Sequence, residues 1–353
     1  MNELSFYQRQ MILKEVGESG QALLKNSKIL IVGAGGLGHP VASYLAAAGV
    51  GEIFICDYDK VELSNLHRQV LFTPDDIGFF KADILAEKIR KQNPFINVNI
   101  INTKLNAENI KSYLNDIDLI VDCCDNFSTK FLLHDSAFLF KKDLVQASIY
   151  QFEGQLQTFP YKTSGTGIGC MRCLWPSIPS DDCSGSCALV GVFGATAGVL
   201  GSMQAMEVIK LICKISKPSI NTTKTVNLIN MEIDSIKWKK DKSCVLCGNN
   251  PKIIKIEMDE YYKKNIFEIT KINLENYRYI DIREKDEYFL DEKPIIFEKK
   301  PFSEFENWKD QISKTEKTVF ICQKGIKSME LVYIFNDLGY KNCFSLKGGF
   351  LDA

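Results

Sequence analysis

A strand, a glycine-rich turn and a helix of small residues follow one another near the start of the chain. Residues 28–32 (KILIV) form a short apolar run, which is typical of a strand buried on both faces. The turn over residues 33–38 reads GAGGLG, and a helix is expected over Pro40–Ala48. Glycines let the backbone turn tightly and approach phosphates, whose charge the helix N-terminus favours. This pattern predicts a nucleotide site and leaves NAD, FAD and ATP almost equally open.

Strands and helices alternate through the first 250 residues, after a helical lead-in. The alternation predicts an α/β fold with a Rossmann-like, doubly wound and mainly parallel sheet. A period-2 pattern over residues 151–161 predicts antiparallel strands added to that sheet. The expected parallel strands are Lys28–Val32, Glu52–Asp57, Val98–Ile101, Leu119–Cys123 and Leu144–Ser148.

A fresh pattern begins beyond residue 250. Strands are expected over Tyr279–Ile282, Val319–Cys322 and Asn342–Leu346, with a helix over Ser328–Leu338. These elements predict a second, smaller α/β domain. The expected domains are therefore residues 1–250 and residues 256–353.

Charge and cysteine content argue against several function classes. A net charge of −1 at pH 7 provides no general attraction to nucleic acid or to an anionic membrane. No basic segment followed by an apolar one opens the chain, so a signal peptide is not expected. The apolar stretch Ala188–Met203 is short and glycine-rich for a membrane span, and a buried helix is expected there. Twelve cysteines, four of them in two C-x-x-C pairs, favour metal and thiol chemistry in a reducing, cytoplasmic setting.

Charged residues after the glycine turn narrow the choice of nucleotide. Asp57 and Asp59 end the second strand, where a carboxylate can accept hydrogen bonds from ribose hydroxyls. Arg68 and Lys81 follow, and such cations offset the charge that develops during attack at an α-phosphate. Asp125 ends another strand, where its carboxylate could hold Mg²⁺. Hydride transfer does not need these cations, so they favour ATP over the alternative of an NAD-dependent oxidoreductase.

Two C-x-x-C pairs predict a metal site. Cys170 pairs with Cys173, and Cys244 pairs with Cys247 much later in the chain. One such pair alone could be a redox pair. Four thiolates complete a closed tetrahedral Zn²⁺ shell, so we predict a structural zinc site.

Several motifs occur in order over residues 1–250: YQRQ, VGAGGLG, DYDKVELSNLHRQ, CCDN, FEGQ and both C-x-x-C pairs. In these motifs the chain resembles the E1-like adenylyltransferases of the MoeB/ThiF/HesA family. The resemblance implies ribose binding by Asp57 and Mg²⁺ ligation or orientation by Asp125. It implies phosphate contacts from Asn65, Arg68 and Lys81. The residues expected to bind the nucleotide are Gly33, Gly35, Gly36, Gly38, Asp57, Asp59, Asn65, Arg68, Gln69, Lys81, Asp125 and Asn126.

The same resemblance implies roles for residues outside the glycine turn. Arg9 matches an arginine that reaches the ATP of the neighbouring subunit, which implies a homodimer. Cys187, in the context C-A-x-x-G-V, matches a crossover-loop cysteine that can form thioester or acyl-disulfide links with a carrier protein. Cys183 is either a resolving partner or without a role. Structural or surface positions are expected for His39, His67 and His134.

A second thiol, Cys322, lies between an expected strand and an expected helix in the segment FICQKGIKS. Backbone N–H groups of such a loop can stabilise a thiolate or a persulfide. With DIRE at residues 281–284 and KGGF at residues 347–350, the region resembles a rhodanese domain. It departs from that family at Gln323 and Lys327, which stand where arginines are usual, and in a shortened stretch between residues 288 and 302. Cys322 is expected to carry a persulfide, and a degenerate docking module is the alternative.

Together the motifs predict ATP-dependent adenylation of a ubiquitin-like sulfur-carrier protein that ends in Gly-Gly. A persulfide on Cys322 would then attack the acyl-adenylate, and Cys187 would resolve the product to a thiocarboxylate. The expected setting is molybdopterin or thiamine biosynthesis, with a cysteine desulfurase as one candidate sulfur donor. A scaffold that only docks the carrier is the remaining alternative. Catalytic roles are expected for Arg9, Arg68, Lys81, Asp125, Cys187 and Cys322.

Overall fold

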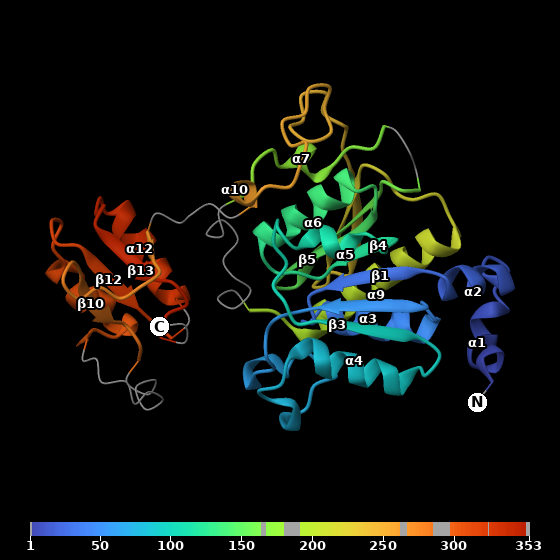
Figure 1. Ribbon diagram of the computed structural model, residues 1–353, viewed down its shortest axis with the longest axis horizontal. Coiled ribbons are helices and arrows are strands. Elements are labelled where there is room, and N and C mark those ends of the chain that lie inside the picture. The colour runs from blue at the N-terminus through green and yellow to red at the C-terminus, as the bar shows by residue number, and fades with distance from the viewer. Residues whose placement is uncertain are drawn as a thin grey trace. The chain divides into compact units, whose positions relative to one another are not determined.

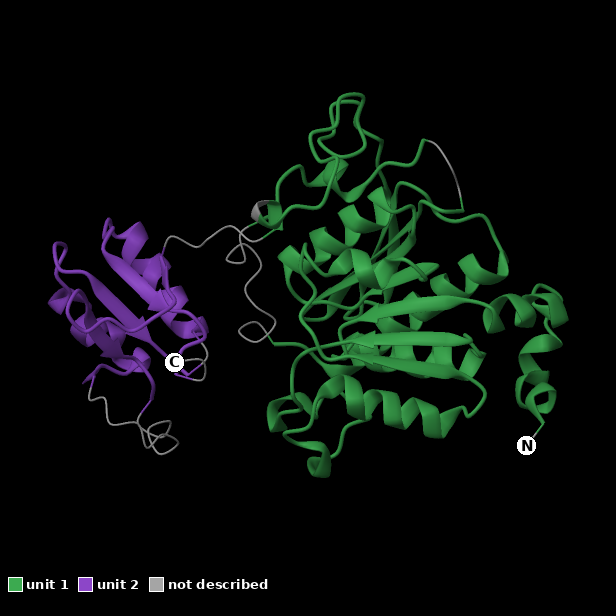
Figure 2. Cartoon of the chain, viewed as in Figure 1, with its two compact units in different colours: residues 1–262 green, residues 263–353 purple. Residues whose placement is uncertain are grey.

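The computed structural model describes residues 2–163, 167–179, 191–261, 267–284, 297–323 and 325–350. The chain divides into two compact units, residues 1–262 and residues 263–353 (Figure 2). This division falls later than the boundary expected between residues 250 and 256.

In its described residues, the first unit has a sheet of eight strands in the order β3-β2-β1-β4-β5-β6-β7-β8 (Figure 1). The strands from β3 to β5 in this order are parallel, and β6, β7 and β8 are antiparallel additions. The expected doubly wound sheet with added antiparallel strands is confirmed. The strands are β1 (Lys28–Val32), β2 (Glu52–Cys56), β3 (Asn97–Ile101), β4 (Leu119–Asp122), β5 (Asp143–Tyr150), β6 (Glu153–Pro160), β7 (Thr222–Asn227) and β8 (Glu232–Lys237). The helices are α1 (Glu3–Met11), α2 (Gly17–Lys25), α3 (Gly38–Ala48), α4 (Lys81–Gln92), α5 (Ile110–Leu114), α6 (Phe127–Leu139), α7 (Met171–Leu174), α9 (Gly194–Cys213) and α10 (Met258–Tyr261).

The core of the first unit lies on both faces of this sheet. Ile29 and Ile31 of β1 belong to a buried cluster that includes residues of α3, α4 and α9. Leu30 and Val32 belong to a second buried cluster, with residues of α5 and α6. Figure 1 shows α4 on one side of the strands and α5 and α6 on the other. Alternate residues of β1 therefore pack against different helices, which explains why residues 29–32 are all apolar.

Helix α9 is long and apolar enough, by length and composition, to cross a membrane. Half of its apolar window is buried inside the unit, and the helix packs against α3, β5 and β6. This burial is typical of a core helix. The helix expected from Ala188 is observed from Gly194, and residues 188–190 lie outside the described residues.

The described part of the second unit contains a parallel sheet of five strands in the order β11-β10-β12-β13-β9. Aromatic rings fill one face, where Phe320 stacks on Phe335 with ring centroids 5.2 Å apart and Trp308 lies 6.2 Å from Phe320. The three expected strands and the expected helix are confirmed. The elements are β9 (Glu268–Ile269), β10 (Arg278–Asp281), β11 (Glu298–Lys299), β12 (Thr318–Ile321), β13 (Cys343–Leu346), α11 (Phe305–Trp308) and α12 (Ile326–Asp337).

Candidate functional site

The carboxyl ends of β1 and β4 meet where the strand order reverses. β1 pairs in parallel with β2 on one side and with β4 on the other, and ligands of open α/β sheets bind at such a switch point. Gly33 follows β1 with a φ of 102°, and a Cβ there would lie 2.6 Å from the carbonyl oxygen of Cys123, which follows β4. A Cβ on Gly38 would lie 2.1 Å from the carbonyl oxygen of Gly33. The turn itself therefore requires both glycines.

Replacing Gly33 with alanine should lower the free energy of unfolding by about 3 kcal/mol or more, because the side chain meets backbone at a positive φ. Gly198 is the matched control. It lies in α9, where an added Cβ meets nothing within 4 Å. Gly198→Ala should raise the unfolding free energy by up to about 1 kcal/mol. Urea unfolding of both variants checks the pair, and a neutral Gly33→Ala would contradict the described turn.

Gly35 is the open position of the turn. An added Cβ there would meet only the Nε2 atom of Gln69, at 3.8 Å, whereas a Cβ on Gly36 would lie 3.0 Å from the Cβ of Ala197 in α9. Gln69 is 2% exposed, and its Oε1 has no hydrogen-bond partner among the described residues. Buried acceptors are normally bonded. An unpartnered acceptor beside an open glycine is therefore the arrangement expected of a ligand site.

Two carboxylates and a lysine lie at the end of β2. The Asp57 carboxylate accepts the N–H groups of Ala34 at 2.7 Å and Asp59 at 2.8 Å, so it ties the glycine turn to β2. Burial raises the pKa of Asp57, and the charge of Lys81 opposes that rise. Lys81 opens α4 with a side chain that is 10% exposed, and its Nζ lies 3.1 Å from the Asp59 carboxylate. A nearly buried positive charge therefore stands beside the glycine turn.

Asn65 and Arg68 lie between β2 and α4. The buried Asn65 ends a short 3-10 helix (Leu63–Asn65), and its Oδ1 accepts a backbone N–H at 3.2 Å, so it caps this turn. Arg68 is half-buried, and its Nη1 donates to the carbonyl of Ser64 at 2.8 Å. Gly194, the first residue of α9, packs against this segment, since a Cβ there would lie 3.0 Å from the Cα of Arg68. The backbone of Arg68 is thus held in place by the start of α9.

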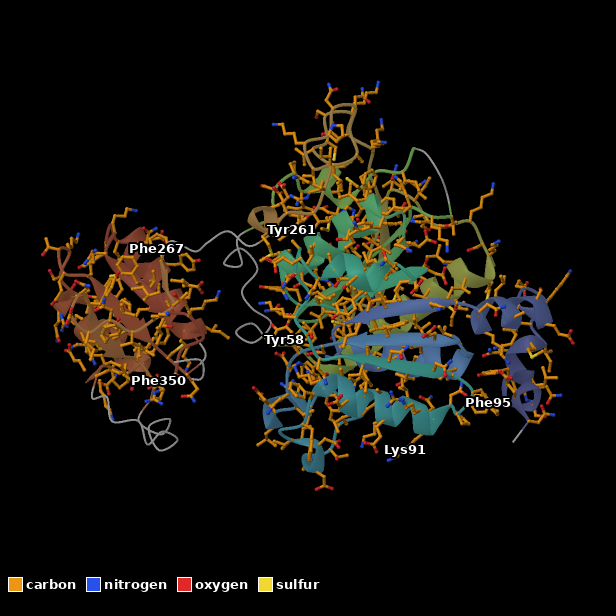
Figure 3. All side chains as sticks on the ribbon, viewed as in Figure 1. Tyr58, Lys91, Phe95, Tyr261, Phe267 and Phe350 are labelled. Atoms are coloured by element: carbon orange, nitrogen blue, oxygen red, sulfur yellow. The ribbon has the colours of Figure 1, made fainter. Side chains whose placement is uncertain are left out.

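The turn after β4 carries Asp125 and Asn126. Asn126 caps α6, where its Oδ1 accepts the N–H of Thr129 at 2.9 Å. Asp125 is exposed at the carboxyl edge of the sheet. Burial and the nearby carboxylates of Asp59 and Asp125 raise the pKa of Tyr58 to about 12. Tyr58, labelled in Figure 3, therefore belongs to the site, and only its position between two aspartates hinted at this in the sequence.

Two buried polar residues that the sequence analysis did not single out hold this turn. Lys130 of α6 pairs with Asp122 at 3.1 Å and donates to the carbonyl of Ala147 at 2.7 Å. Gln204 of α9 donates to the carbonyls of Asp122 at 2.7 Å and Val145 at 3.1 Å. Together they tie β4 to β5 behind the candidate Mg²⁺ ligand.

Among the described residues of the first unit, the expected site residue Arg9 does not join this group. Arg9 is exposed on α1, whose Gln10 donates to the carbonyl of Ala48, at the end of α3 opposite the glycine turn. A single chain therefore does not bring Arg9 to the turn. Cys183 and Cys187 lie outside the described residues.

His39 is buried behind the glycine turn, and its Nδ1 accepts the N–H of Leu71 at 3.0 Å. Burial lowers the pKa of His39 to about 3, so the folded protein keeps a neutral ring while the unfolded chain gains a proton below about pH 6.5. Stability should therefore fall as the pH drops. From pH 7.5 to 5.5 this residue should contribute a loss of about 1 kcal/mol. Urea unfolding at both pH values should show that the wild type loses about 1 kcal/mol more unfolding free energy than His39→Asn does. Equal losses in the two proteins would contradict a buried, neutral His39.

Four cysteine sulfurs from the two C-x-x-C pairs converge. The sulfur of Cys170 lies 3.9 Å from that of Cys173 and 3.4 Å from that of Cys244. The sulfurs of Cys173 and Cys247 are 3.4 Å apart, and all four lie within 4.8 Å of one another. Sulfurs on one tetrahedral Zn²⁺ are about 3.8 Å apart, because each Zn–S bond is about 2.3 Å. The predicted cluster is confirmed and is compatible with a metal site.

Buried side chains anchor this cluster to α6. His134 of α6 accepts the N–H of Met171, within the first C-x-x-C pair, at 2.9 Å. The next residue, Asp135, accepts from Arg172 at 2.8 Å and from the hydroxyl of Tyr261 at 3.0 Å (Figure 3). His134 thus has a structural role, as expected.

In the second unit, Cys322 follows β12 and is 3% exposed. Its sulfur accepts the N–H of Ser328, in the first turn of α12, at 3.4 Å. The buried Arg283 donates to Gln323 at 3.3 Å, but its charge is offset by Asp281, 2.9 Å away. A helix N-terminus therefore borders this thiol, and an ion-paired guanidinium contacts the residue that follows it.

The first unit thus belongs to the class of nucleotide-binding proteins with a doubly wound sheet, a glycine turn at its switch point and a four-cysteine cluster. Its family is also clear: the chain belongs to the ThiF family, which matches residues 7–246. Residues 268–352 match the rhodanese-like domain.

Curated relatives agree with this family. The chain is 41% identical over 250 residues to the sulfur carrier protein adenylyltransferase of Thermus thermophilus, covering 70% of this chain and 92% of that protein. It is 40% identical over 256 residues to the adenylyltransferase and sulfurtransferase MOCS3 of Culex quinquefasciatus, covering 72% of this chain and 58% of the relative. The MOCS3 of Caenorhabditis briggsae is 35% identical over 311 residues, covering 82% of this chain and 74% of the relative.

Solved structures show the same fold. Crystal structures of E. coli MccB match with a TM-score of 0.61 and 25% identity in the complex with AMPCPP and MccA, covering 70% of this chain and 75% of that chain. The complex of MccB with ATP matches with a TM-score of 0.57 and 27% identity, covering 65% of this chain and 69% of that chain.

Proposed function

We propose that the protein adenylates the C-terminal glycine of a ubiquitin-like sulfur-carrier protein and then transfers sulfur to it. The observation that carries the proposal is the convergence of the open Gly35, the nearly buried Lys81 and the exposed Asp125 at one switch point. The names of the Thermus and Culex relatives support both activities. The two matched domains supply one candidate site for each step.

In the adenylation step the carrier carboxylate attacks the α-phosphate of ATP, and pyrophosphate leaves. The Lys81 ammonium and the Arg68 guanidinium offset the charge that develops on the phosphate oxygens. Asp57 accepts hydrogen bonds from the ribose, and Tyr58 lies near the carboxylates of Asp59 and Asp125 at the same edge of the sheet. No general base is required, because the carboxylate is already nucleophilic and positioning supplies much of the rate.

Two metal ions fit the donor groups that the chain provides. The exposed Asp125 carboxylate would hold Mg²⁺, which neutralises phosphate charge when bound. The four-cysteine cluster would hold Zn²⁺ in a closed shell with a structural role. The four cysteines form no disulfide bond, which suits a reducing compartment, and we place the protein in the cytoplasm on that ground.

In the sulfur step a persulfide on Cys322 attacks the acyl-adenylate, and AMP leaves. The carrier is then joined to Cys322 through an acyl disulfide. Attack by the Cys187 thiolate on the Cys322 sulfur releases the carrier as a thiocarboxylate and leaves a disulfide between the two cysteines. A cellular dithiol reductant resets that disulfide, and a cysteine desulfurase is a candidate source of the next sulfur.

Carrier-dependent ATP–pyrophosphate exchange tests the proposal. Candidate carriers from molybdopterin, thiamine, tRNA-thiolation and cysteine pathways are each assayed intact and without the terminal Gly-Gly. Exchange that requires the intact tail is the expected result and identifies the carrier. A folded, metal-loaded protein that exchanges with none of them would favour a docking scaffold. Thiocarboxylate formation by Cys322→Ser at the wild-type rate would remove the sulfur step and leave the rhodanese-like domain as a docking module.

We also propose that Arg9 completes the site of a second copy of the chain in a homodimer. Arg9→Ala and Lys81→Ala chains should each lack exchange activity. Mixed dimers contain one intact site, so an equimolar mixture should recover about a quarter of the wild-type activity. A mixture as inactive as its components would place Arg9 outside the site.

A further inference from the structure

Three buried side chains from three elements form a chain of polar contacts that the sulfur step above does not use. Cys322 follows β12, Ser328 lies in the first turn of α12, and Ser345 lies on β13. The Cys322 sulfur lies 3.4 Å from the Ser328 hydroxyl, which lies 2.7 Å from the Ser345 hydroxyl. The Ser345 hydroxyl in turn lies 3.4 Å from the carbonyl oxygen of Gly325. Both serines are fully buried, so water does not compete for these contacts.

The proton positions along this chain depend on the state of the sulfur. Each hydroxyl has one proton to donate. When Cys322 is a neutral thiol, its S–H can donate to Ser328, Ser328 to Ser345, and Ser345 to the carbonyl of Gly325. Every donor in the chain then has an acceptor.

A sulfur that carries negative charge can only accept. Both hydroxyls then reverse: Ser345 donates to Ser328, and Ser328 donates to the sulfur. The N–H of Ser328 already points at the same atom, at 3.4 Å. Bonds to a charged acceptor are stronger than bonds between neutral groups, and a buried charge without them is costly. The reversal gives up the weak contact to Gly325, and the contact between Ser328 and the sulfur becomes a charge-assisted bond.

We propose that Ser328 and Ser345 form a hydroxyl relay that stabilises the negatively charged sulfur of Cys322. Ser328 acts as a catalytic residue by direct contact, and Ser345 is a positioning residue that acts through Ser328. This inference rests on the proposed role of Cys322 in sulfur transfer. In that role the Cys322 thiolate attacks the outer sulfur of a persulfide donor, whose S–S bond breaks. The donor leaves as a thiolate, and Cys322 keeps the transferred sulfur.

The relay is tested in the full-length chain with glutathione persulfide as the sulfur donor. Mass spectrometry follows the gain of one sulfur atom on the Cys322 peptide, and alkylation of the same peptide by iodoacetamide gives a second rate. Ser328→Ala should lower both rates about ten-fold or more, the effect of one lost charge-assisted bond. Ser345→Ala should lower them about three-fold. The double variant should match Ser328→Ala, because Ser345 has nothing left to orient.

Rescue and stability measurements separate the relay from a packing effect. Ser328→Thr and Ser345→Thr keep the hydroxyl and should recover most of the rate, while Tm values of the alanine variants report packing. If Ser328→Ala does not fold, the test depends on the Ser345 variants. Both rates should then fall in Ser345→Ala and recover in Ser345→Thr. A further fall when Ser345→Ala is added to Ser328→Ala, or unchanged rates in Ser328→Ala, would overturn the relay. So would a wild-type Cys322 inert to both reagents.

The two readouts also separate the relay from the proposed function. Serine-dependent alkylation without sulfur uptake at Cys322 would support the relay and contradict the sulfur step. Sulfur uptake that does not depend on the serines would support the sulfur step and contradict the relay.

Discussion

Replacing Lys81 with alanine should lower the rate of carrier-dependent ATP–pyrophosphate exchange by about 10²–10³-fold, the usual effect of removing one preorganised group that stabilises transition-state charge. The Lys81 side chain is only 10% exposed, and its Nζ is held 3.1 Å from the Asp59 carboxylate at the start of α4. Water therefore screens its charge poorly. Because the charge matters most while pyrophosphate leaves, kcat should fall more than the affinity for ATP.

Lys91 provides the matched control for this prediction. It lies on the same helix, where Figure 3 labels it, and its side chain is 72% exposed in an ion pair with Glu87. Lys91→Ala should exchange at the wild-type rate. The Tm of Lys81→Ala should also stay close to that of the wild type, because the Asp59 partner is half exposed and such pairs contribute about 0–1 kcal/mol. Equal exchange rates in the two lysine variants would remove Lys81 from the reaction.

Replacing Cys244 with serine should release the bound metal and lower the Tm of the first unit by roughly 10 °C or more. Cys244 is 3% exposed, and its sulfur lies 3.4 Å from that of Cys170. The cluster joins two segments that are distant in sequence, so the metal contributes directly to folding. Metal content and differential scanning calorimetry on the same samples check both parts of the expectation.

Cys213→Ala is the control for the loss of a buried thiol. Cys213 is buried in α9, where its sulfur donates to the carbonyl of Gly20 at 3.6 Å, outside the four-cysteine cluster. This variant should keep its metal and lose only about 1 kcal/mol of stability. Full metal content in Cys244→Ser, with a Tm like that of Cys213→Ala, would contradict a closed four-thiolate site.

Local patterns in the sequence predicted the features that depend on nearby residues. The turn after β1 was predictable because Gly33 adopts a φ of 102° and Gly38 packs on its carbonyl, so the requirement for glycine is visible within six positions. The strands buried on both faces, such as β1 and β4, were predictable because most of their residues are apolar. Both C-x-x-C pairs were predictable because each brings two thiols together within one turn.

Strands β7 and β8 were not predicted, because neither shows a regular alternation of buried and exposed residues. Every residue of β8 is exposed, so no alternation of buried and exposed positions marks it in the sequence. Its pairing with β7 places it in the sheet. The short strands β9 and β11 have two residues each, too few for any period to be read.

The partners of the site residues were decided by tertiary structure alone. Gln204 is one of several polar residues in a mainly apolar helix, and only the strand order β1-β4-β5 places it against the carbonyl of Asp122. Ser328 and Ser345 likewise meet only because α12 packs on β13. Neighbouring residues thus specify the helices, the strands and the residue types that the chemistry needs. Contacts between distant residues depend on strand order and helix packing. Both result from the packing of the whole core, so a local sequence pattern cannot predict these contacts.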